Sequence, residues 1–258
     1  MNLKIHIITL LILLVSSDCV GTHPQLSASI CDEPGTLQSD SVKSPTQGFD
    51  ISFQIYLPPC YEKQTNAHFP TIYLITMPFE AQLNANDNTP MSLADRLIHA
   101  EKIPPVIIIV PDDTVAQGYH RALAMDLVSY IDQTYRTIPD RHFRGVGGIS
   151  HGGGIAARMA FQFPDVFGSV GILSGGIDVS EKPAFDTWIT STSANHWPRV
   201  RIDVGTQDGI MPFTQNLASV LDHAQVPYTF NEGTGDLNWA FWSARMESYL
   251  LWFAEAWK

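Results

Sequence analysis

Ser150 is the residue whose neighbours best suit a nucleophile. It lies in Gly148-Ile149-Ser150-His151-Gly152, a G-x-S-x-G pattern whose glycines leave room for a tight turn between a strand and a helix. Such a turn holds the serine oxygen clear of the backbone, at the start of the following helix. The pattern also arises by chance, so the alternative is a glycine-rich turn with an incidental serine. The surrounding sequence has to decide between them.

Asp208 is the candidate acid. A serine hydroxyl is a weak nucleophile at neutral pH, so hydrolysis needs a histidine that takes its proton and a carboxylate that orients this histidine. Asp208 stands in Gly205-Thr206-Gln207-Asp208-Gly209, directly after a predicted strand at 200–204. The alternative for Asp208 is a turn or N-cap residue before the next helix.

The elements that must position these residues alternate between strands and helices. Alternating or continuous apolar runs predict strands, and apolar residues at spacings of about four predict helices. We expect strands near 37–42 and at 51–57, 71–75, 106–110, 143–149, 170–173, 200–204 and 228–230, and helices at 92–101, 119–136, 151–163, 213–224 and 239–256. This alternation predicts an α/β protein with a mostly parallel sheet covered on both faces. Ser150 then lies at the carboxyl end of an internal strand, where such sheets bind ligands.

Further motifs are spread along the chain. They are Tyr-Leu-Pro-Pro-Cys-Tyr at 56–61, Ile-Pro-Asp-Arg at 138–141, Gly-Gly-Ile-Ser-His-Gly-Gly at 147–153, Pro-Asp-Val-Phe-Gly at 164–168 and Leu-Ser-Gly at 173–175. Together they resemble the Putative esterase family of α/β-hydrolases, which includes esterase D, enterochelin and feruloyl esterases and secreted mycolyltransferases. The resemblance implies an α/β-hydrolase fold, carboxylic-ester hydrolysis without a cofactor, Ser150 as nucleophile and Asp208 as acid.

The oxyanion hole departs from the family pattern. The resemblance assigns one donor to the backbone N–H of His151, whose side chain points elsewhere. The second donor comes from a His-Gly loop in the family, whereas this chain has Thr76-Met77-Pro78-Phe79 after the strand at 71–75. Because proline has no N–H, we expect Met77 or Phe79 to supply this donor.

The catalytic histidine of the family is missing at its usual position. Registering the chain on the tryptophans of the last helix puts Leu237 there. Leucine cannot accept a proton, and loss of the base in a serine hydrolase lowers turnover on the order of a millionfold. The adjacent Asp236 is a weaker base than imidazole at an ordinary carboxyl pKa. His196 and His223 do not match the position by chain order.

Three hypotheses about function follow from these residues. The first is an esterase that uses Ser150 and Asp208 and whose activity is impaired by Leu237. The second is a non-catalytic pseudo-hydrolase that binds a ligand in the retained pocket. The third is that Leu237 is a substitution in one isolate of an otherwise ordinary esterase.

Aromatic residues fall into two groups. Burial tendencies place Trp239, Phe241, Trp242, Trp252 and Trp257 in the core, packed under the last helix. Phe79, Trp188 and Trp197 lie in segments expected above the sheet edge, and we expect them to line an acyl or aryl pocket.

Residues 1–21 have the pattern of a secretory signal peptide. Lys4 precedes an apolar run at 7–15, and small or polar residues follow. The run is too short for a membrane-spanning helix, and Asp18 disfavours lipid attachment to Cys19. Export would permit a disulfide between Cys31 and Cys60, and the alternative is two buried thiols.

Composition bounds the remaining possibilities. The 258 residues, 45% of them hydrophobic, fit one domain at 22–258 after the signal peptide. A net charge of −11 with 15 Lys and Arg argues against nucleic acid or an anionic membrane surface as the main partner. The nine histidines make no metal-binding spacing, so we expect no metal. The expected partner is a small-molecule or polymer-linked ester.

Overall fold

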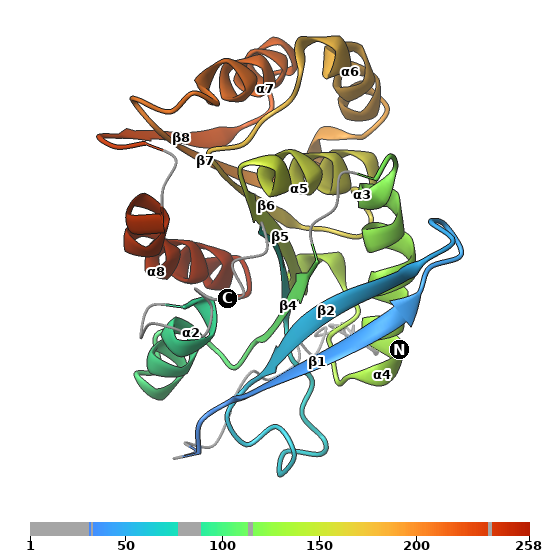
Figure 1. The fold of residues 1–258 in the computed structure, drawn as a ribbon, viewed down its shortest axis with the longest axis vertical. Helices are drawn as coiled ribbons and strands as arrows, with labels where there is room; N and C mark the ends of the chain where they lie inside the picture. The colour runs from blue at the N-terminus through green and yellow to red at the C-terminus, as the bar shows by residue number, and fades with distance from the viewer. Residues whose placement is uncertain (1–30, 32, 77–88, 113–115, 237–238) are drawn as a thin grey trace, which may run out of the picture.

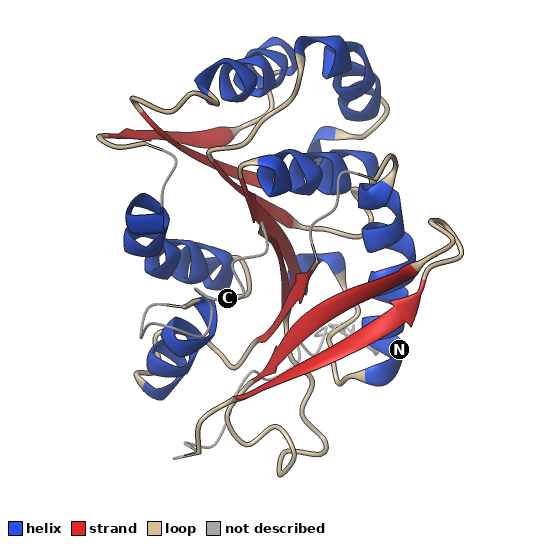
Figure 2. Cartoon of the chain, in the orientation of Figure 1, coloured by secondary structure: helices blue, strands red, loops and turns tan. Residues whose placement is uncertain are grey.

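An eight-stranded sheet forms the centre of the protein (Figures 1 and 2). The computed structural model describes residues 31, 33–76, 89–112, 116–236 and 239–258. The strands are β1 (Thr36–Lys43), β2 (Asp50–Leu57), β3 (Thr71–Ile75), β4 (Ile107–Pro111), β5 (Arg144–Ile149), β6 (Ser169–Leu173), β7 (Arg199–Gly205) and β8 (Tyr228–Gly233).

The sheet has the order β1-β2-β4-β3-β5-β6-β7-β8. β2 pairs antiparallel with β1 and with β4, and every pair from β4 to β8 is parallel. The predicted α/β architecture with a mostly parallel sheet is therefore confirmed. Ser150 follows β5 and Asp208 follows β7, so both residues lie at the carboxyl edge of the parallel strands.

Helices cover both faces of the sheet, as Figure 1 shows. One face carries α3 (Tyr119–Ala122), α4 (Val128–Thr134), α5 (His151–Gln162), α6 (Lys182–Thr190) and α7 (Met211–Ala224), and the other carries α2 (Pro90–His99) and α8 (Trp239–Glu255). Side chains alternate between these two cores along each strand. Tyr73 and Ile75 of β3 join the first core, whereas Ile72 and Leu74 join the second.

The helix predicted at 119–136 contains a π-helical turn. α3 passes into a π-helix at Leu123–Leu127 and then into α4. Its apolar residues recur every four positions, which drifts by roughly 40° per step on a helix of 3.6 residues per turn. One wider turn compensates this drift, so Leu123, Leu127 and Ile131 all remain fully buried.

The last helix packs directly onto glycines of the central strands. A Cβ on Gly145 of β5 would lie 2.6 Å from the Phe253 ring, and one on Gly171 of β6 would lie 2.6 Å from the Tyr249 ring. The small residues therefore allow the aromatic face of α8 to contact the sheet backbone. Phe241, Trp242, Trp252 and Trp257 are at most 7% exposed, which confirms their predicted place in the core. The side chain of Trp239 lies outside the described part of the chain.

α6 is a helix that the sequence analysis did not predict. It begins after a short 3-10 turn, Val179–Glu181, whose capping box joins Asp178 and Glu181, and Pro183 occupies its first turn. Such caps satisfy N–H groups that have no partner within the helix. Only Phe185 and Ile189 of this helix are buried.

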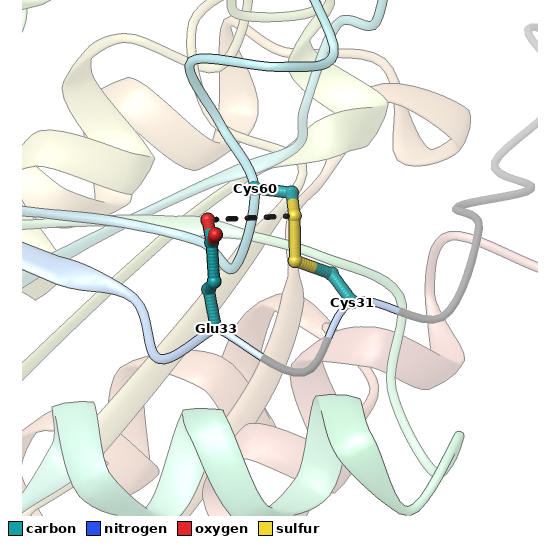
Figure 3. Close-up of side chains that lie close together, drawn as sticks. All are labelled: Cys31, Glu33 and Cys60. Atoms are coloured by element: carbon teal, nitrogen blue, oxygen red, sulfur yellow. Dashed lines mark hydrogen bonds between the residues drawn. A yellow bond between two sulfur atoms is a disulfide. The ribbon is translucent and has the colours of Figure 1, made fainter.

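A disulfide joins Cys31 to Cys60, with the two Cα atoms 6.0 Å apart (Figure 3). It ties the segment before β1 to the turn after β2, and thereby confirms the predicted pair. The Glu33 carboxylate lies 3.9 Å from the Cys60 sulfur and 2.5 Å from the Lys63 ammonium group. Within the described residues this is the one cluster with metal-ligand spacing. Because its sulfurs are bonded to each other, they are not available as thiolate ligands.

The residues expected to form the signal peptide, together with Cys19, lie outside the described part of the chain. Among the helices that the structure describes, none combines the length and apolarity that crossing a bilayer requires.

Candidate active site

Ser150 adopts a strained backbone conformation between β5 and α5. Its φ is 56° and its ψ is −121°, a region that residues other than glycine rarely occupy. The Ser150 N–H donates to the Leu173 carbonyl at 2.9 Å, and the Ser150 carbonyl accepts from Gly153 N–H at 3.0 Å. These bonds hold the turn in place, with Ser150 half-buried and His151 exposed. The local geometry is that of a nucleophile elbow.

Neither of the two glycines that flank the elbow, Gly148 and Gly152, has room for a side chain. A Cβ on Gly148 would lie 2.2 Å from the carbonyl oxygen of Gly152, and one on Gly152 would lie 2.1 Å from the carbonyl oxygen of Ile75. Backbone atoms cannot rotate away as a flexible side chain can. The G-x-S-x-G pattern is therefore a consequence of how tightly β3, β5 and α5 meet.

Asp208 lies between β7 and α7 and is 5% exposed. Its carboxylate accepts from the Ser174 hydroxyl and, at 3.0 Å, from the Ile210 N–H. The second contact has the geometry of an Asx turn before a helix, which is the structural alternative weighed for this residue. The first contact joins Asp208 to the carboxyl end of β6, beside the elbow.

Ser174 is the residue of this site that sequence reasoning missed. It is fully buried with a φ of 40°, and its N–H donates to the Asp203 carbonyl at 2.8 Å. The next residue, Gly175, lies so close to the elbow that a Cβ there would be 2.9 Å from the Ser150 carbonyl oxygen. The Leu-Ser-Gly motif at 173–175 signalled this position, but its spacing to Asp208 did not reveal the contact.

A buried polar network supports the strand below this site. The Asp203 carboxylate accepts from Arg201 Nε at 2.8 Å and from Asn231 Nδ2 at 3.3 Å. The Tyr249 hydroxyl lies 2.8 Å from the same carboxylate and 3.1 Å from the Ile172 carbonyl. Burial, reinforced by the charge of Asp203, raises the pKa of Tyr249. The phenol therefore stays protonated and acts as a donor.

A cavity of about 510 Å³ borders the elbow along α5. His151, Ile155, Arg158 and Gln162 form one wall, because residues three or four apart share a helix face. The opposite walls come from residues 116–121, after β4, and from Glu181 and Trp188, after β6. Trp188 and His151, the residue after Ser150, therefore line the same cavity.

Trp197 does not share this cavity. It precedes the amino end of β7, whereas Asp208 follows the carboxyl end, and seven residues of strand span roughly 20 Å. There it lines a separate cavity of about 390 Å³ with Arg199 and Tyr228. The expectation that Trp197 lines a pocket at Ser150 is therefore not met, because strand direction places it at the opposite sheet edge.

The described histidines considered as alternative bases lie away from the elbow. His196 precedes β7 at the amino edge and pairs with Asp165 at 2.6 Å, and His223 is exposed in the last turn of α7. His120 contacts Gln162 at 2.7 Å, at the end of α5 that lies roughly 16 Å from His151. This geometry agrees with the chain-order argument for His196 and His223.

Several predicted site residues lie outside the described part of the chain. These are Met77 and Phe79 of the oxyanion loop and Leu237 at the position of the family's histidine. Asp236, next to Leu237, is exposed. The roles predicted for these residues remain predictions.

In sequence, the chain matches one family model and parts of two known proteins. The family model described as Putative esterase matches residues 44–253. The Bacillus subtilis protein YjcH is 29% identical over 139 residues, covering 51% of this chain and 58% of YjcH. An endo-1,4-beta-xylanase/feruloyl esterase from Xylanibacter ruminicola is 24% identical over 171 residues, covering 57% of this chain and 23% of that protein. The matches thus span less than two thirds of either relative.

Solved structures share the fold over most of the chain. A ferulic acid esterase has a TM-score of 0.73 and 19% identity, covering 87% of this chain and 99% of that one. A feruloyl esterase module from Clostridium thermocellum complexed with sinapinate has a TM-score of 0.72 and 17% identity, covering 88% and 91%. S-formylglutathione hydrolase from Staphylococcus aureus has a TM-score of 0.65 and 19% identity, covering 86% and 100%.

These likenesses confirm the predicted α/β-hydrolase fold and the resemblance drawn from the motifs. The turn at Ser150 follows β5 and the loop at Asp208 follows β7, both at the carboxyl edge of the parallel strands. The family match covers both loops. This chain belongs to the Putative esterase family of α/β-hydrolases.

Proposed function

We propose that this chain is an exported serine hydrolase that cleaves carboxylic esters, with Ser150 as nucleophile and Asp208 as acid. The observation that carries the proposal is the conformation of Ser150, strained at φ 56° between two glycines that tolerate no side chain. Strain of this kind is kept where function needs it. The buried carboxylate of Asp208 at the end of β7 supports the same assignment.

The proposed reaction is acyl transfer in two steps. The Ser150 oxygen attacks the ester carbonyl carbon, its proton passes to solvent water in place of a histidine, and the carbonyl oxygen becomes an oxyanion. The His151 N–H and one N–H of the loop at Met77 or Phe79 would stabilise this oxyanion. The alcohol leaves with a proton, and water then hydrolyses the acyl-serine. Leu237 offers no base for either proton transfer, so we expect slow turnover.

The first substrates to examine are hydroxycinnamate esters. Neighbours in fold are named as ferulic acid and feruloyl esterases, and one was solved with sinapinate. Small or polymer-linked esters of such acids therefore fit the proposal. The secretory pattern at 1–21 and the disulfide Cys31–Cys60 support export.

The second candidate function is ligand binding without catalysis. Leu237 favours it, and so does the environment of Asp208. Its carboxylate already accepts from the Ser174 hydroxyl and the Ile210 N–H, so its charge is stabilised without an imidazole. In this alternative the pocket holds an ester or acid and releases it unchanged.

A labelling experiment separates these hypotheses. The unsubstituted chain and the variants Ser150→Ala and Leu237→His would be treated with a fluorophosphonate and assayed with methyl ferulate and p-nitrophenyl acetate. The proposal expects slow, Ser150-dependent labelling and turnover, with an increase of at least a hundredfold in Leu237→His. Turnover no faster than in Ser150→Ala, combined with tight ferulate binding, would support the ligand-binding alternative.

The Leu237→His variant also tests the explanation from isolate variation. Full esterase activity after this single change would mean that the rest of the site is intact. Activity that stays at background would instead implicate a second defect, and the oxyanion loop with Pro78 is then the first place to examine.

A further inference from the structure

A cavity lies along α5, next to the elbow. We call it the α5 groove and define it by Gln117, His120, Arg121, Arg158, Glu181 and Trp188, with the α5 residues His151, Ile155 and Gln162 along its length. Its volume of about 510 Å³ lies within the range of small-molecule sites. Its walls follow β4, β5 and β6, so it opens at the same sheet edge as Ser150.

The positive charges of the groove stand out in an acidic protein. The chain has only 15 Lys and Arg against 26 Asp and Glu, yet two arginines, Arg121 and Arg158, line this one cavity. Arg121 is exposed, and its guanidinium makes no hydrogen bond or ion pair within the part of the chain that the structure describes. Glu181 is the single carboxylate among the described lining residues.

The side-chain oxygen atoms of Glu181 and Gln162 already accept hydrogen bonds within the protein. Both Glu181 oxygens accept from Arg158 at 2.6 Å, and Oε2 also accepts from the Asp178 N–H at 2.9 Å. Gln162 Oε1 lies 2.7 Å from His120 Nε2 and accepts a hydrogen bond from it. The side-chain groups left for a ligand include the Arg121 guanidinium and the Gln162 amide N–H groups, while the Gln117 amide offers both a donor and an acceptor.

A cavity in which the Arg121 guanidinium has no counter-charge among the described residues fits an anionic ligand. A neutral sugar would bring hydroxyl groups but no charge to pair with this arginine. A carboxylate accepts through both oxygens and gains charge-assisted hydrogen bonds from an arginine. We propose that the α5 groove binds the carboxylate of a ring-sized organic acid, held by Arg121 beside Arg158 and Trp188.

Such an acid has two chemical sources, an acidic group on the ester substrate itself or a separate small molecule. In the first case the bound acid lies across the elbow at His151, and it slows access to Ser150. In the second case it occupies only the far part of the groove, near His120 and Gln162. Binding is a property of the groove in both cases and does not depend on catalysis.

The experiment uses D-glucuronate as probe and D-glucose as the matched neutral control, with binding followed by calorimetry and saturation-transfer NMR on the full chain. One arginine with its neighbouring donors predicts a Kd in the millimolar range. We expect glucose to bind at least tenfold more weakly, and glucuronate binding to weaken as salt is raised.

Two substitutions of Arg121 test the assignment. Arg121→Gln is expected to weaken glucuronate binding at least fivefold, whereas Arg121→Lys keeps the charge and most of the affinity. Lys43→Gln is the matched control, since Lys43 is exposed on β1 and its loss removes the same charge elsewhere. Equal binding of glucose and glucuronate, or equal affinity in Arg121→Gln and Lys43→Gln, would overturn the proposal.

A labelling measurement then distinguishes the two sources. Saturating glucuronate that slows fluorophosphonate labelling in the Leu237→His protein indicates that the acid reaches the elbow, as a part of the substrate would. Unchanged labelling with undiminished binding indicates a separate ligand. Glucuronate binding is measured without any turnover. A groove that binds no acid and a chain that lacks esterase activity therefore give different results.

Discussion

The Ser174 hydroxyl donates a hydrogen bond to the Asp208 carboxylate, and both side chains are almost completely buried. The contact joins the ends of β6 and β7, while Gly175 packs against the Ser150 carbonyl. Ser174 thus connects the loop of the proposed acid to the loop of the proposed nucleophile. Its left-handed φ of 40° indicates that the connection is kept against backbone strain.

Replacing Ser174 tests this connection. Ser174→Ala leaves the buried carboxylate with one protein donor fewer, so we expect a loss of about 1–3 kcal/mol in the free energy of unfolding. Ser174→Gly removes the same hydrogen bond but relieves the strain of a positive φ, by about 1 kcal/mol. Urea unfolding should therefore rank the native protein above the Gly variant and the Gly variant above the Ala variant.

The esterase kinetics of the same two variants can be measured in the Leu237→His background. If Ser174 orients Asp208, both variants lower kcat for methyl ferulate and leave KM nearly unchanged. A merely structural role would leave kcat intact wherever the protein is folded. Equal stability of Ser174→Ala and the native protein would mean that the hydrogen bond contributes nothing.

The glycines of the elbow give a second prediction. Gly148→Ala places a methyl group 2.2 Å from a backbone oxygen, and we expect the protein to lose at least about 3 kcal/mol of stability, because overpacking forces the backbone to move. Gly209→Ala is the matched control, since nothing lies within 4 Å of its Cβ position. Thermal unfolding should show Gly209→Ala within a few degrees of the native protein. Equal melting temperatures for the two variants would refute the steric account.

The sequence predicts most of the elements because their patterns are local. β3 has the bounds expected from its apolar run, 71–75, and the other strands differ by one to three residues at their ends. α6 was missed because its apolar face is short, with Phe185 and Ile189 as its buried residues. The expectation for Trp197 failed for another reason, since an aromatic residue before a strand lies at the opposite edge from one after it.

The site is less predictable from sequence than the fold. Motifs mark Ser150 and Asp208, but the contact between Ser174 and Asp208 joins residues 34 positions apart. The α5 groove combines residues from three separate segments of the chain, 116–121, 151–162 and 181–188. Neither has a local signature, because both depend on the order in which the strands assemble.

The buried phenol of Tyr249 gives a prediction on stability. Tyr249→Phe leaves the Asp203 carboxylate and the Ile172 carbonyl without this donor, so we expect a loss of about 1–3 kcal/mol. Tyr130→Phe is the control, because its hydroxyl also contacts a carboxylate, Asp40 at 2.8 Å, but on a partly exposed surface. Its loss should be smaller, about 0.5 kcal/mol. The reverse order in urea unfolding would contradict the role given to the Asp203 network.

His120 makes the stability of the fold depend on pH in a predictable direction. Burial lowers its pKa below the ordinary 6.5, the hydrogen bond to Gln162 opposes this, and the charges of Arg158 and Arg121 add to it, with Glu181 acting in the opposite sense. The unfolded chain therefore binds the proton more readily than the folded one. Stability falls as the pH drops below about 6.5 and levels off below the folded pKa.

Removing this imidazole should flatten the pH dependence. We expect the free energy of unfolding to decrease less between pH 8 and pH 5 in His120→Asn than in the native protein, when both are measured by urea unfolding. His223→Asn, which removes an exposed imidazole from the end of α7, controls for the general effect of losing a histidine. A steeper decrease in His120→Asn would mean that the folded state favours the protonated ring. That result would contradict the direction assigned to burial of the His120 ring and to the charges of its two neighbouring arginines.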